Sequence, residues 1–133
     1  MVSGARYAYF ALAWGFLAGL VVQVFFIGLA LFAGSNNLAL HVNLGWILHL
    51  MPILILVAAA LARAGRQQIL LAGALALTVF VVPILVLLRE SAPVVAALHP
   101  VGALLAFWVA VFVARGASQL LRNATSGAGS RST

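Results

Sequence analysis

The sequence predicts an all-α integral membrane protein, an up-and-down bundle of four transmembrane helices. Its 133 residues are 66% hydrophobic and only 6% charged, whereas charged residues make up about a quarter of a soluble domain. The mean hydropathy is +1.24. A helix needs about 20 apolar residues to span a bilayer, so the chain has room for four spans and for no separate soluble domain.

Four apolar runs, each bounded by turn residues or arginine, are the predicted spans. They cover residues 7–32, 38–62, 68–88 and 93–114. Gly34 and Asn37 bracket a turn after the first run, and Pro93 suits the first position of the fourth helix. We expect residues 1–122 to form one four-helix domain. The polar residues 123–133 cannot bury a core, so we expect them to be a disordered tail.

The charge pattern indicates orientation in a membrane. The chain has seven arginines and one acidic residue, Glu90, for a net charge of +6. The arginines stand singly or in pairs at the ends of the apolar runs, which favours anionic lipid and not nucleic acid as the partner. Arg89 is alone on one side, and six arginines share the other: Arg6, Arg63, Arg66, Arg115, Arg122 and Arg131. The positive-inside rule then predicts an inner (plasma) membrane protein with both termini in the cytoplasm.

Composition also excludes several kinds of chemistry. The chain has no Cys, so disulfides, thiolate metal sites, Fe–S clusters and thiol catalysis are excluded. It has no Asp, and Glu90 lies in a predicted surface turn. Paired carboxylates for acid–base catalysis are therefore absent from the sequence. We expect the chain not to be an enzyme, unless it transfers electrons through a haem.

Small residues recur at four-residue spacing in two of the spans. Such stripes let helix backbones approach closely in lipid, although an Ala-rich and Gly-rich chain also produces them by chance. The first span carries Ala11, Gly15 and Gly19 followed by Gln23, and the fourth carries Gly102, Ala106, Ala110 and Ala114. Three prolines inside spans, Pro52, Pro83 and Pro100, can kink their helices and free a carbonyl one turn back.

The histidines are the candidate functional residues, because ionisable groups inside a span are costly and usually face the bundle interior. His49 precedes Arg63 by 14 residues and His99 precedes Arg115 by 16, which is about 21 and 24 Å of helix. The two should therefore lie at nearly the same depth. His41 precedes Arg63 by 22 residues, about 33 Å, so we expect it at the outer membrane interface.

One hypothesis is that the bundle holds a haem b. In an up-and-down bundle the second and fourth spans lie diagonally across the core, so His49 and His99 would face each other and could be the two axial ligands of the iron. Gly45 and Gly102 would let the ring approach closely. Metal would then bind through haem iron only.

The alternative is that the histidines stabilise the bundle by hydrogen bonds. His49 and His99 could bond to each other, to Asn43, to Gln23 or to a freed carbonyl. A site of three histidines for a metal ion is not expected, because His41 lies too far along the helix to meet the other two.

Two motifs resemble a family of small uncharacterised bacterial membrane proteins with four spans. One is the run His41-Val-Asn-Leu-Gly-Trp46 with the basic turn that follows it, and the other is Leu98-His-Pro-Val-Gly102 with Ala114-Arg-Gly-Ala117 closing that span. The resemblance covers nearly the whole chain. It implies the four-span architecture and no particular activity.

The dipeptide His99-Pro100 is also similar to helix starts in four-helix membrane cytochromes b. That resemblance implies electron transfer through haem. The chain departs from the di-haem members because it has no His near the cytoplasmic ends of the second and fourth spans, so it implies one haem at most.

These observations lead to two functional hypotheses. The first is a membrane protein of unassigned activity, structural or accessory to a membrane complex, with a membrane-protein partner or a second copy of itself. The second is a one-haem cytochrome b with His49 and His99 as ligands. A carrier or channel is disfavoured, because four spans with few polar residues leave little to line a hydrated path.

Overall fold

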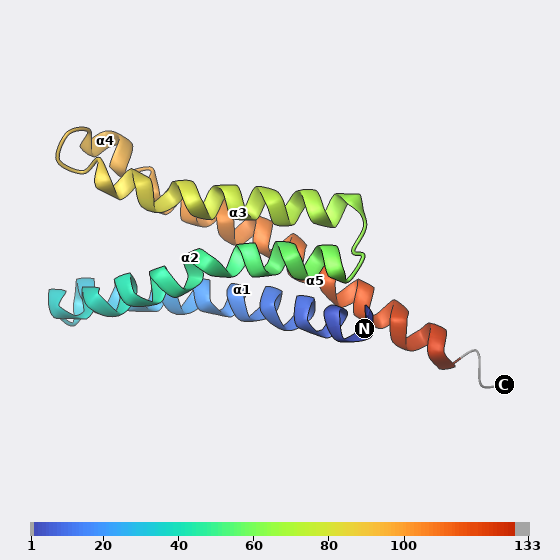
Figure 1. The fold of residues 1–133 in the computed structure, drawn as a ribbon. Coiled ribbons are helices and arrows are strands. Elements are labelled where there is room, and N and C mark those ends of the chain that lie inside the picture. The colour runs from blue at the N-terminus through green and yellow to red at the C-terminus, as the bar shows by residue number, and fades with distance from the viewer. Residues whose placement is uncertain (1, 130–133) are drawn as a thin grey trace.

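The computed structural model describes residues 2–129, which form a bundle of long helices (Figure 1). The elements are α1 (Val2–Phe32), a 3-10 turn η1 (Ser35–Asn37), α2 (Leu38–Leu61), α3 (Arg66–Leu87), α4 (Pro93–Ala96) and α5 (His99–Gly129). No strand occurs in this part of the chain. Four of its helical stretches are long and apolar enough to cross a membrane: Gly4–Phe32, Ser35–Leu61, Arg66–Leu87 and Pro93–Asn123.

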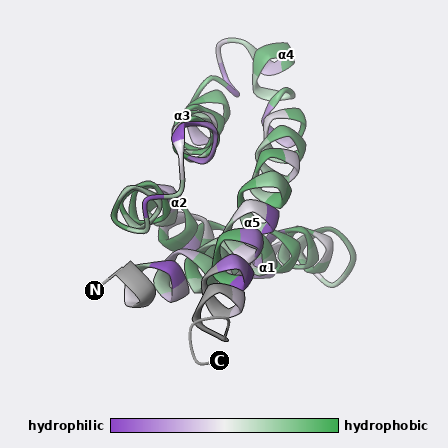
Figure 2. Cartoon of the chain, turned by 90° about the vertical axis from the view of Figure 1, so that its right-hand side faces the viewer, coloured by the Kyte–Doolittle hydropathy of each residue, from purple (hydrophilic) through white to green (hydrophobic). Residues whose placement is uncertain are grey.

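The four long helices are arranged up and down, as the sequence predicted. α1 packs against α2 and α5, and α3 packs against the same two helices, so α2 and α5 lie on a diagonal. The N-terminal end of α1 and the C-terminal end of α5 lie at the same end of the bundle (Figure 1). Figure 2 shows hydrophobic residues along all four long helices, with hydrophilic residues near this end and in the turns. The all-α membrane-bundle prediction is confirmed.

The core occupies one half of the bundle. We call residues 2–17, 48–75 and 106–129 the terminal half, and residues 18–47 and 76–105 the far half. Every buried residue of the described chain belongs to the terminal half. The largest fully buried side chains are Tyr9, Phe16, Ile55, Leu75, Val113 and Pro52. In the far half the hairpin of α1 and α2 diverges from that of α3 and α5 (Figure 1), which explains why no residue there is buried.

The small-residue stripes form close helix contacts. A Cβ atom added at Gly19 would lie 2.5 Å from Leu48 Cδ2, and one added at Gly102 would lie 2.7 Å from Val82 Cγ2. Ala106 and Ala110 are 2% and 1% exposed. The stripe on α1 therefore packs against α2, and the start of the stripe on α5 packs against α3.

The fourth span differs from the prediction at its start. We expected one helix from residue 93, but the chain forms the short α4 and then, after two turn residues, α5. Pro100 has no N–H to donate and its ring would clash with the carbonyl of Ala96. The backbone instead turns, with Leu98 N bonded to Val95 O at 3.0 Å, and α4 lies beyond the far end of α3 (Figure 1).

The same span also differs at its end. α5 continues past residue 114 to Gly129, so residues 123–129, which we expected to be disordered, are helical. Packing against the bundle continues past residue 114, which is why the helix does not end there: Ala117 is fully buried, Gly116 lies directly against the side chain of Gln68, and Ser118 Oγ accepts a hydrogen bond from Trp14 Nε1 at 2.9 Å. Residues 130–133 of the expected tail lie outside the described residues.

Candidate functional site

The three histidines lie on α2 and α5, the two helices that are diagonally opposite each other in the bundle. His41 is in the first turn of α2, His49 is two turns further along the same helix, and His99 is the first residue of α5. All three side chains are half-buried. α2 therefore carries two histidines, and its diagonal neighbour carries the third.

His99 meets His41. The centroids of the two rings are 6.5 Å apart and the ring planes are inclined at 69°. This contact joins the hairpin of α1 and α2 to that of α3 and α5 in the far half, where the backbones diverge. We expected His41 to lie too far along its helix to meet the other two histidines, and for His99 that expectation is wrong.

His49 lies in an aromatic environment. Its ring is 4.2 Å from that of Phe80 on α3 and 6.0 Å from that of Trp46 on its own helix, centroid to centroid. Its Nδ1 atom is buried and has no hydrogen-bond partner among the described residues. The structure thus surrounds His49 with aromatic side chains and gives His99 a different histidine as neighbour.

His99 lies beside His41, and does not face His49 as expected, because its depth in the bundle differs from the expected depth. The sequence-based depth counts residues from Arg115 as the cytoplasmic boundary of the fourth span. In the structure α5 is packed beyond that residue, at Gly116 and Ser118, so the start of α5 lies further toward the far end than the count implied. His99 is therefore level with the first turns of α2 and not with His49.

Backbone carbonyls hold two of the imidazoles. His41 Nδ1 lies 3.2 Å from the carbonyl oxygen of Gln23 on α1, and His99 Nδ1 lies 2.9 Å from that of Val82 on α3. A carbonyl oxygen can only accept, so Nδ1 donates in both pairs. Each bond joins the two helices of one hairpin, which agrees with the alternative that histidines stabilise the bundle.

The two glycines that we expected to admit a porphyrin ring face side chains of the protein itself. A Cβ atom on Gly45 would lie 3.0 Å from Gln23 Nε2, and one on Gly102 would meet Val82. The space in front of each glycine is therefore occupied by a neighbouring helix. Neither glycine faces an open slot.

Gln23 makes more contacts than its place in the sequence predicts. The sequence indicates a hydrogen-bond partner at the end of a small-residue stripe. In the structure its carbonyl holds His41, its side chain covers Gly45, and its Oε1 atom is buried without a partner among the described residues. Its amide side chain in the apolar far half of α1 was the signal, because polar groups in spans are costly. The carbonyl of Val82 has no such signal.

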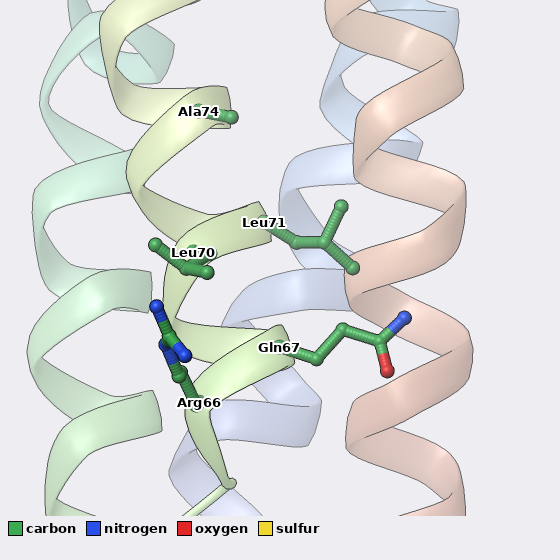
Figure 3. A pocket seen from close by; sticks show the side chains of 5 residues that line it. All are labelled: Arg66, Gln67, Leu70, Leu71 and Ala74. Atoms are coloured by element: carbon green, nitrogen blue, oxygen red, sulfur yellow. The ribbon is translucent and has the colours of Figure 1, made fainter.

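Two described cavities lie at the opposite end of the bundle. The larger, of about 560 Å³, is open and mostly apolar. Its lining residues are Arg66, Gln67, Leu70, Leu71 and Ala74 at the start of α3, with Gln67 and Leu71 extending toward α5 (Figure 3). A second, of about 350 Å³, lies beside the turn before α3 and the end of α5. Neither cavity includes a histidine.

These features define the class of protein. The chain is a multi-pass membrane protein whose apolar helices contact the lipid bilayer. Its half-buried polar residues include Gln23, His41 and His99 in the far half.

More specifically, the chain belongs to the family of unknown function DUF6220, whose model matches residues 23–92. The matched range is more than half of the 133 residues. It contains Gln23, His41 and His49, together with the run from His41 to Trp46 on which the expected resemblance rested, and it ends before the run that begins at Leu98. No curated protein and no solved structure matches the chain.

Proposed function

We propose that this chain is an accessory protein of the membrane that packs against a larger membrane polypeptide. This proposal rests on the unequal burial of the two halves of the bundle. The terminal half holds the whole described core, and the far half has no buried residue. Apolar side chains there, such as Val24 at 69% and Ile84 at 54% exposed, suit lipid or a protein partner. An apolar segment seated between the diverging hairpins would supply the packing that this half lacks.

Site-specific photo-crosslinking in native membranes tests this proposal. A photoreactive amino acid is placed at Leu44 or Val79, which are half-buried residues of the far half, and in a control variant at Leu77, which is 68% exposed. The expected result is one discrete protein adduct from the first two positions and lipid adducts from the control. Lipid adducts from all three positions would contradict the proposal, and an adduct of twice the chain mass would indicate a homo-oligomer instead.

We also propose that the protein resides in the plasma membrane with both termini in the cytoplasm. Five described arginines, at positions 6, 63, 66, 115 and 122, lie toward the end of the bundle that carries the termini, and Arg89 lies at the other. Anionic lipid and the positive-inside rule favour the arginine-rich end inside.

Because the chain has no Cys, single-cysteine variants report on this orientation directly. Cys in place of Asn36, in the turn before α2, should react with a membrane-impermeant maleimide added outside intact cells. Cys in place of Ala64, in the turn before α3, should react only after the cells are opened. The reverse pattern would contradict the orientation.

Haem b bound by His49 and His99 stays a prediction. One observation favours it, since His49 brings a buried ring nitrogen without a partner into the bundle. An absorption spectrum of purified protein from haem-replete cells tests it. The hypothesis requires a Soret band that is lost in His49→Ala and in His99→Ala, and a colourless, folded preparation would remove it.

A further inference from the structure

The contact between His41 and His99 joins two polar side chains in an apolar, loosely packed part of the bundle. Two imidazoles from different hairpins stand 6.5 Å apart in the half of the bundle where no described residue is buried. Polar groups in an apolar phase are costly unless they are paired. The contact therefore needs an explanation beyond the hairpin hydrogen bonds that each ring makes.

Those hydrogen bonds fix the tautomer of both neutral rings. Because Nδ1 of His41 donates to Gln23 O and Nδ1 of His99 donates to Val82 O, the neutral form of each ring has its lone pair on Nε2. Neither Nε2 has a hydrogen-bond partner among the side chains that the structure describes. Donation of one ring nitrogen to a backbone carbonyl is also how metal-ligating histidines are oriented and made more basic.

Gln23, the residue that holds His41, carries one more unpaired acceptor. Gln23 Oε1 is buried without a partner, and its residue supplies the carbonyl that holds His41. The described acidic side chain, Glu90, is exposed and lies 3.8 Å from Arg89. Two ring nitrogens that each offer a lone pair, with no hydrogen-bond donor bound to either, fit a cation.

We propose that His41 and His99 bind one first-row transition-metal ion, of which copper fits best, between the two hairpins. Bonds from imidazole nitrogen to such an ion are about 2.0–2.1 Å long, so ring centroids 6.5 Å apart leave room for one ion bonded to one nitrogen of each ring. Imidazole ligands suit Cu, Zn, Fe and Ni, and Cu²⁺ is the tightest of the divalent series. Among the described residues no group of three His, Cys, Asp or Glu side chains gathers, so the side chains supply two ligands and water the others.

The site does not rest on the accessory role proposed above, whose apolar partner segment would compete with the ion for the space between the hairpins. It also competes with haem, because the haem hypothesis uses His99 together with His49. The ion would tie the two hairpins together at the end where their backbones diverge. Gln23 is a positioning residue in this scheme, because its backbone oxygen orients the His41 ring.

Titration of the purified full chain with Cu²⁺ tests the site, with isothermal calorimetry for stoichiometry and electron paramagnetic resonance for the ligands. We expect one Cu²⁺ per chain, with hyperfine coupling from two nitrogens. His41→Asn and His99→Asn retain an amide donor at the position of Nδ1 but remove Nε2. Each should weaken binding about 100-fold or more, since loss of an outer-sphere partner alone costs 10–100-fold.

His49→Asn is the matched control and should bind Cu²⁺ as the unchanged chain does. Circular dichroism shows whether each variant is folded. If either Asn variant fails to fold, protection of the unchanged chain replaces it: Cu²⁺ should shield His41 and His99, but not His49, from diethyl pyrocarbonate. Absence of tight binding to the folded chain, retained affinity in both Asn variants, or equal protection of all three histidines would overturn the proposal.

Discussion

Replacing Gly19 by alanine should destabilise the bundle, although alanine is the better helix former. The added Cβ would lie 2.5 Å from Leu48 Cδ2 and 3.4 Å from its Cδ1, which is closer than carbon atoms pack. Leu48 is 4% exposed, so its side chain has little room to move aside. The two helices must then separate or Leu48 must take a strained rotamer.

The magnitude follows from two opposing terms. Gly→Ala inside a helix is worth about 0.5–1 kcal/mol in favour of folding, and inserting a methyl group into a filled contact costs about 1–3 kcal/mol. Gly28→Ala isolates the first term, because a Cβ on Gly28 of the same helix has nothing within 4 Å. The free energy of unfolding of Gly19→Ala should therefore lie about 1–3 kcal/mol below that of Gly28→Ala.

Reversible unfolding in mixed micelles, followed by far-UV circular dichroism, measures this difference. A double-mutant cycle with Leu48→Ala adds a second criterion. Leu48→Ala alone should cost about 2–5 kcal/mol, but in the Gly19→Ala background it also removes the clash, so the two effects should not add. Equal stabilities of Gly19→Ala and Gly28→Ala, or full additivity with Leu48→Ala, would refute the close contact of α1 with α2.

Two further substitutions test the terminal half by the same unfolding assay. Tyr9→Phe removes the hydrogen bond from the Tyr9 hydroxyl to Gln68 Oε1, 3.0 Å long, and should lower the free energy of unfolding by about 0.5–1.5 kcal/mol. Tyr7→Phe is the control, because Tyr7 is 56% exposed, and it should have no effect. Equal effects of the two substitutions would argue against the hydrogen bond. Gly65 has φ +80 and ψ 158 in the turn before α3, a conformation nearly confined to glycine, so Gly65→Ala should cost about 1–3 kcal/mol. Gly73→Ala, inside α3 with open space around it, should stabilise, and a stabilising Gly65→Ala would contradict the turn conformation.

The bundle was predictable because its causes are local to the sequence. Apolar runs of bilayer length, separated by turn residues, leave few alternatives to spanning helices. Short connections make successive helices antiparallel neighbours. The same reasoning put α2 and α5 on the diagonal, as the structure has them, and it also identified two histidine-bearing helices.

The pairing of the histidines was not predictable because it depends on depth. Arginine is a poor marker of depth, since its long side chain reaches the interface from a backbone position well inside the apolar phase. The position of Arg115 therefore did not show that packing continues to Gly116 and Ser118. The carbonyls of Gln23 and Val82 are backbone atoms and leave no trace in residue type, so the anchoring of His41 and His99 could be found only from coordinates.

The concentration of buried residues in the terminal half gives the molecule the shape of a wedge. Its cross-section grows toward the far end, where the hairpins spread (Figure 1), so it displaces more lipid area from one leaflet than from the other. A wedge of this shape occupies unequal areas in the two leaflets, so lipids of unequal headgroup and chain width would pack best around its two ends.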